Sequence, residues 1–85
     1  MSQSDNVIDI RRPVEFTVDG RAFATTARRQ RAADVLVLAG RDPAQYDLGE
    51  LRGRLPFPVR YEGREIVSIH KGTRFVSLRD RVGLL

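Results

Sequence analysis

The chain has 85 residues, 41% of them hydrophobic, and a net charge of +4. A chain this short buries only about 60% of its unfolded surface in one core, so we expect a single domain. It has no cysteine and only one histidine, His70. This composition excludes a disulfide framework, a thiolate metal site and a thioester-forming nucleophile. We therefore expect no catalytic residue, no metal site and no cofactor, which means a protein that is not itself an enzyme.

The positive charge comes almost entirely from arginines that are spread along the whole sequence. Because this charge is dispersed, nucleic acid is a disfavoured partner. No run of about 18 apolar residues is present to span a bilayer. The first residues, Met1 to Ile10, lack the basic start and apolar centre of a signal peptide. We expect a cytoplasmic protein without a membrane partner.

Residues 1–12 are predicted to form a flexible N-terminal tail. Ser2 to Asn6 are polar and bury nothing, so no burial compensates the entropy lost on ordering them. The segment Val7 to Ile10 is β-prone and leaves two alternatives open. It is either a frayed lead-in to Pro13 or a strand lent to the sheet edge of a neighbouring molecule.

Residues 14–25 predict a β-hairpin. Apolar and polar residues alternate up to Val18, and a second extended run follows Asp19-Gly20. An Asp-Gly pair accepts positive φ at both turn positions, which suits a two-residue hairpin turn. This turn sets Phe16 opposite Phe23, so the two aromatic rings mark the core face.

The period changes to that of a helix between Gln30 and Ala39. Apolar residues fall at i, i+3, i+4 and i+7, namely Ala32, Val35, Leu36 and Ala39. Gly40 suits a left-handed C-terminal cap, and Asp42-Pro43 blocks continuation of the helix. Val37 and Leu38 cannot both share the apolar stripe, so we expect one of them to be partly exposed and open to a recognising protein.

Three further strands are predicted after the helix. The first runs from about Tyr46 to Arg52, and Gly53 to Arg64 reads as an irregular, arginine-rich connection. Glu65 to Ile69 and Arg74 to Leu78 are β-prone, and Lys71-Gly72 between them predicts a closing hairpin or a bend. The elements together predict an α+β fold in which a mixed sheet of four to five strands packs on one helix.

The order of these elements is the layout of the ubiquitin-like β-grasp, and two stretches resemble the bacterial multiubiquitin-domain family. In the first, Ala33 to Leu48, a helix ends in Leu-Ala-Gly before Asp-Pro and Tyr; in the second, Ile69 to Val76, a Lys-Gly turn precedes Phe-Val. The resemblance covers Val14 to Leu78. It implies a ubiquitin-like modifier domain over residues 13–78, with partners that are an activating enzyme, a conjugating enzyme and a deconjugating or processing peptidase.

The end of the chain, residues 79–85, is predicted to be a C-terminal tail. Leu78 to Gly83 is similar to the Leu-Arg-Leu-Arg-Gly-Gly end of ubiquitin, with departures at Asp80 and Val82 and two leucines added beyond. The resemblance implies that a peptidase removes Leu84 and Leu85 and that Gly83 then supplies the carboxylate for conjugation.

Three side chains are candidates for contacts with partner enzymes or for chain formation. Arg79 and Arg81 alternate in an extended tail, so both can pair with carboxylates of an activating enzyme. The alternative is a solvated basic tail. Lys71, the only lysine, is a candidate acceptor in chain formation, although its place before Gly72 is also ordinary turn chemistry.

Other function classes remain open at this stage. A non-covalent β-grasp adaptor or self-assembling protein would use its sheet edges or the Val7 to Ile10 segment. An arginine-based nucleic-acid binder would show steep salt dependence. A sulfur carrier of the same fold would end in a free Gly-Gly, which this chain lacks.

Overall fold

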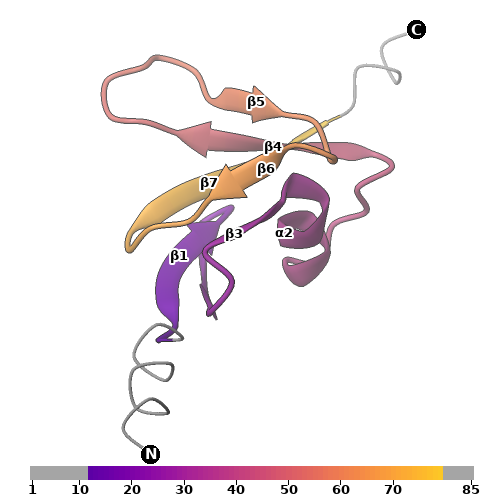
Figure 1. Ribbon diagram of the computed structural model, residues 1–85. Coiled ribbons are helices and arrows are strands. Elements are labelled where there is room, and N and C mark those ends of the chain that lie inside the picture. Colours follow the sequence, from indigo (N-terminus) through magenta and orange to yellow (C-terminus); the bar gives the residue numbers. More distant parts are fainter. Residues whose placement is uncertain (1–11, 80–85) are drawn as a thin grey trace, which may run out of the picture.

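The computed structural model describes residues 12–79 as one layer of sheet packed on a helix (Figure 1). The elements are β1 (Val14–Val18), β2 (Arg21–Thr25), β3 (Arg29–Arg31), α2 (Ala32–Leu38), β4 (Tyr46–Leu51), β5 (Val59–Tyr61), β6 (Ile66–Ser68) and β7 (Thr73–Arg79). Five strands form a mixed sheet in the order β2-β1-β7-β4-β5, and β3 pairs with β6 in a second, two-stranded sheet. The predicted α+β, β-grasp-like fold is confirmed.

The predicted hairpin is present with the predicted register. Phe16 faces Phe23 across β1 and β2, and their ring centroids lie 6.0 Å apart. Asp19 and Gly20 both have positive φ, 52° and 82°, as the two-residue turn requires. The Asp-Gly pair therefore sets which face of the hairpin is buried.

The helix begins later than the sequence pattern predicted. Arg29–Arg31 form β3, an antiparallel partner of β6, and α2 starts at Ala32. The first backbone N–H groups of the helix, at Ala32 and Ala33, donate to the carbonyls of Glu65 and Gly63 at 2.8 and 2.9 Å. Strand pairing therefore continues up to the helix, and backbone carbonyls replace a side-chain N-cap.

The helix ends as predicted. Gly40 adopts φ 81°, and its N–H donates to the Val37 carbonyl at 3.0 Å. The N–H of Arg41 donates to the Leu36 carbonyl at 2.8 Å. This pair of hydrogen bonds satisfies carbonyls that the last turn would otherwise leave open, so the chain leaves the helix towards β4 in a fixed direction.

The segment after β4 departs from prediction at one point. The connection predicted to be irregular, Gly53 to Arg64, contains β5, which pairs antiparallel with β4. Of the two alternatives predicted at Lys71-Gly72, the structure has the bend and not the hairpin, because β6 pairs with β3 while β7 pairs with β1 and β4. Gly72 takes φ 85° in this bend, which redirects the chain into the large sheet.

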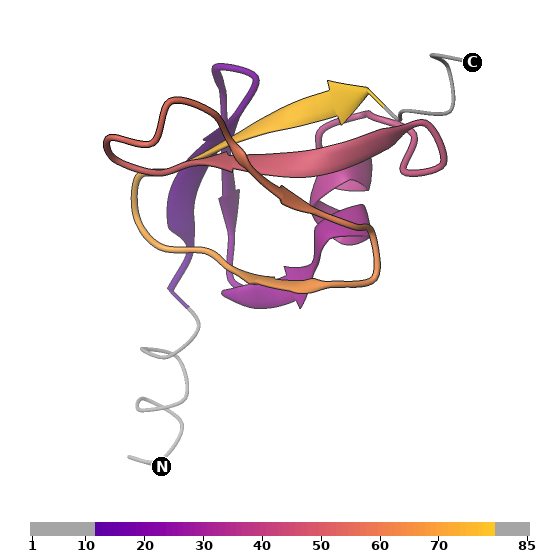
Figure 2. The same ribbon diagram turned by 90° about the horizontal axis from the view of Figure 1, so that it is seen from above.

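The core lies between α2 and the five-stranded sheet (Figure 2). Its largest fully buried side chains are Phe16, Phe75, Leu36, Leu48 and Ile69. The Phe75 ring meets Phe16 edge to face at a centroid distance of 6.0 Å. Phe75 therefore anchors β7 in the core, while β1 and β4 pair with this strand on either side.

Strand β7 runs through Arg79, one residue past the predicted domain boundary at 78. Its last residues pair with the start of β4, where Tyr46 lies opposite Arg79. Within residues 12–79, no helix is long and apolar enough to cross a membrane.

Candidate functional site

The end of β7 lies beside three other side chains, and we name this group the tail base: Asp19, Arg41, Tyr46 and Arg79. The Arg79 guanidinium lies 5.7 Å from the centroid of the Tyr46 ring, and the Arg41 guanidinium lies 5.3 Å from it. Cations are attracted to the face of an aromatic ring. Tyr46 thus holds two guanidinium groups where the described chain leaves the sheet.

Asp19 connects the hairpin turn to the last part of β7. Its carboxylate accepts hydrogen bonds from the Ser77 backbone N–H at 2.9 Å and from Ser77 Oγ at 2.7 Å. The Asp19 N–H donates to the Phe75 carbonyl at 2.9 Å. These three contacts fix β7 two residues before Arg79, so the fold itself holds the tail base in place.

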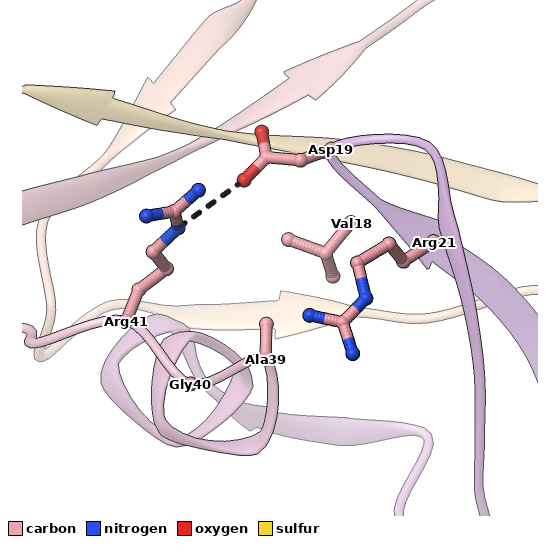
Figure 3. A pocket seen from close by; sticks show the side chains of 6 residues that line it. All are labelled: Val18, Asp19, Arg21, Ala39, Gly40 and Arg41. Carbon is pink, nitrogen blue, oxygen red and sulfur yellow. Dashed lines mark ion pairs between the residues drawn. The ribbon is translucent and has the colours of Figure 1, made fainter.

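The same carboxylate forms an ion pair with Arg41, Nε to Oδ2, at 3.6 Å (Figure 3). Burial alone would raise the pKa of Asp19, but the hydrogen bonds from Ser77 and the charge of Arg41 outweigh it and lower the pKa below its ordinary value of 3.8. Asp19 is therefore a carboxylate at neutral pH, and Arg41 is held towards the sheet.

A cavity of about 240 Å³ opens beside the tail base, between the hairpin turn and the end of α2. It is lined by Val18, Asp19, Arg21, Ala39, Gly40 and Arg41. Figure 3 shows Arg21 and Arg41 entering it from two different elements, with Asp19 beside Arg41. Two guanidinium groups against one carboxylate leave an excess positive charge, which suits a partner's carboxylate.

The predicted acceptor lysine lies away from the tail base. Lys71 is exposed in the bend that precedes β7, while Arg79 is at the other end of the same strand. The neighbouring His70 is also exposed, and its backbone N–H donates to Thr73 Oγ1 at 2.9 Å. The structure therefore does not bring the predicted acceptor and the predicted partner-binding arginine together.

The remaining predicted tail residues, Arg81, Gly83, Leu84 and Leu85, lie outside the described residues. That Arg79 and Arg81 point to the same side of an extended tail therefore stays a prediction. The predicted exposed apolar spot on α2 involves both candidates, because Val37 is 61% and Leu38 46% exposed.

Sequence reasoning missed Arg41, Tyr46 and the second role of Asp19. The Asp-Gly pair predicts the place of Asp19 in the hairpin turn. It does not predict the hydrogen bond to Ser77, which lies 58 positions further along the chain. A contact at that separation leaves no local pattern. The sequence pattern predicts that Tyr46 begins a strand. The adjacent residues in the sequence do not indicate that two guanidinium groups lie over its ring.

Among residues 12–79, no cluster of three or more histidine, aspartate or glutamate side chains is placed to hold a metal ion. Comparison with protein-family models, with curated proteins and with solved structures found no match to this chain.

Proposed function

We propose that the protein is a ubiquitin-like modifier of a bacterial ubiquitination-like conjugation pathway. The observation that supports this most is the position of Arg79 at the end of β7, a strand held on both sides by β1 and β4. The sequence continues from this fixed strand end to Gly83. Fully extended, Arg79 to Gly83 reaches about 16 Å, enough to bring a carboxylate into a partner's cleft.

The chemistry in this proposal belongs to the partners. A processing peptidase hydrolyses the bond after Gly83 and releases Leu84-Leu85. An activating enzyme then adenylates the Gly83 carboxylate, and a conjugating enzyme passes it to a nucleophile on the target. Gly83 has no side chain and so allows close approach of a catalyst to its carboxylate, whereas Val82 is bulkier than a second glycine would be.

The tail base gives this pathway a recognition surface. Arg79 and Arg41 share the Tyr46 ring, and each keeps N–H donors that can pair with a carboxylate of the activating enzyme. Arg81 adds a second tail guanidinium in the same proposal. The partner surface is therefore acidic and placed to meet the domain where the tail begins.

The test uses the full chain with an N-terminal tag, expressed in cells that encode it, and looks for covalent adducts under denaturing conditions. Trypsin cuts after Arg81, so a conjugated target carries a Val82-Gly83 remnant on the modified side chain. We expect lysines with this remnant, and an otherwise identical chain ending at Val82 should yield none. Recovery of only intact, unconjugated chain with Leu84-Leu85 still present would reject the modifier function.

Lys71 gives a second, separable test. It is the only lysine of the sequence, so any lysine-linked chain of copies must use it. Replacing it by arginine, Lys71→Arg, should remove adducts in which one copy is joined to another and leave copies joined to the target unchanged. Persistence of copy-to-copy linkage in this variant would show that Lys71 is not the acceptor.

A non-covalent adaptor or self-assembling protein is the second candidate, and the free side of β2 favours it. In the described part of the chain, β2 pairs only with β1, so one side of its five residues offers backbone groups to an added strand. Deleting residues 80–85 separates the two functions. Association that survives this deletion, with no covalent adduct from the full chain, would support the adaptor.

A further inference from the structure

The loop between β4 and β5, residues 52–58, exposes apolar side chains that the fold does not use. Phe57 is 67% and Leu55 51% exposed, and Phe57 is the most exposed large apolar residue of the described chain. Figure 1 shows this loop extending past the end of the sheet. Two large apolar side chains exposed on the same short loop mark a candidate interaction surface.

The loop is held in shape from within. The Leu55 N–H donates to the Arg52 carbonyl at 2.9 Å, and Gly53 takes φ 43° in the turn that results. Pro56 and Pro58 further restrict the backbone on either side of Phe57. Little conformational entropy therefore remains to be lost when Phe57 is buried by a partner.

Arginines lie within this loop and beside both of its ends. Arg52 pairs with Glu50 at 3.2 Å, and Arg60 pairs with Asp47, so these two guanidinium groups are already balanced. No ion pair joins Arg54 to a carboxylate within residues 12–79, and the same holds for Arg74. Arg74 lies opposite Leu51, the last residue before the loop, in the pairing of β7 with β4.

We infer that this loop is a peripheral membrane anchor that inserts Phe57 and Leu55 into the interface of an anionic lipid bilayer. Apolar side chains enter the acyl boundary, while Arg54 and Arg74 meet the anionic headgroups. A projecting loop suits a soft, flat surface, because it can enter lipid without a matching groove. The absence of an apolar run long enough to span a bilayer predicts no membrane partner, but insertion of a loop requires no such run.

The loop and the end of β7 lie at opposite ends of the sheet. In the antiparallel pairing of β4 with β7, Tyr46 lies opposite Arg79 and Leu51 lies opposite Arg74. The two pairs are five residue steps apart along the strands, a distance of about 17 Å. A bilayer at the loop therefore leaves the end of β7 open to other proteins, and the anchor does not depend on the proposed conjugation.

The test measures co-sedimentation of the full chain with vesicles of phosphatidylcholine, with and without about 30% phosphatidylglycerol. We expect binding to the anionic vesicles alone. Phe57→Ser should lower the partition coefficient about tenfold, and Arg54→Gln should lower it about fivefold. The control is Ile66→Ser, which removes an apolar side chain on β6 that is 53% exposed and should bind as the unchanged chain does.

A fluorescent variant reports insertion directly. The chain has no tryptophan, so Phe57→Trp carries a single indole, and its emission should shift to the blue on anionic vesicles while that of Ile66→Trp should not. Binding should persist in a chain ending at Arg79, whether or not conjugation occurs. Three results would each overturn the anchor: no anionic-vesicle binding, equal loss in both serine variants, or a Phe57→Trp shift with membrane-free cell extract but not with vesicles, which would assign the loop to a protein.

Discussion

Asp19 is the residue on which the geometry of the tail base depends. Its φ of 52° is one that asparagine also tolerates, so Asp19→Asn keeps the turn and removes only the charge. Because hydrogen bonds to a charged group are the stronger ones, we expect a loss of about 1–2 kcal/mol in the free energy of unfolding at pH 7. Urea unfolding measures this loss, and Asp34→Asn, at an exposed ion pair, serves as the control with less than about 0.5 kcal/mol.

The effect of Asp19→Asn on the free energy of unfolding should also depend on pH, in a direction set by the lowered pKa of Asp19. The pKa of Asp19 is lower in the folded protein than its ordinary 3.8, so the stability from its charge is fully present above that value. It is lost as the pH falls through the lower, folded-state pKa. The difference in unfolding free energy between the unchanged chain and Asp19→Asn should therefore be constant near neutral pH and shrink below 3.8. A difference that grows on acidification would contradict this role.

Gly49 is required by packing and not by backbone conformation. A Cβ on this residue, in the middle of β4, would lie 2.8 Å from Leu78 Cδ1 and 2.9 Å from the Cβ of Pro58. Gly49→Ala should cost about 1–3 kcal/mol in unfolding free energy, since the sheet must shift to admit the methyl group. In a Leu78→Ala background the cost should be smaller but not zero, because Pro58 remains. Equal stability of Gly49→Ala and the unchanged chain would show that Leu78 and Pro58 can move away at no cost in free energy.

At the level of elements, α2 divides into a buried and an exposed face. Leu36 is fully buried in the core, whereas Val37 is mostly exposed. Leu36→Ala should therefore cost about 2–5 kcal/mol by urea unfolding, while Val37→Lys should change stability by less than about 0.5 kcal/mol. If Val37→Lys proved as costly as Leu36→Ala, the helix would be rotated from the position described.

The elements that the sequence predicted well are those with local causes. The Asp19-Gly20 turn and the Gly40 cap depend on the conformational freedom of a few adjacent residues, so both could be read from the chain. Arg29–Arg31 and Val59–Tyr61 became strands because distant partners pair with them, and three-residue strands carry almost no period. The Asp19 to Ser77 contact of the tail base fails to appear in sequence for the same reason.

At the scale of the whole molecule, the modifier function requires a tail that can be separated from the domain. A chain ending at Arg79 keeps the whole of β7 and the four residues of the tail base. We expect the unfolding free energy of that chain to lie within about 0.5 kcal/mol of that of the full chain.

A chain ending at Val76 loses Ser77, which binds Asp19, and three residue pairs between β4 and β7. It should be unfolded or strongly destabilised by circular dichroism, because the central strand would then be held at one end only. If the cut after Arg79 were as damaging as the cut after Val76, the last six residues would be part of the fold, and an enzyme could not take hold of them without unfolding the domain.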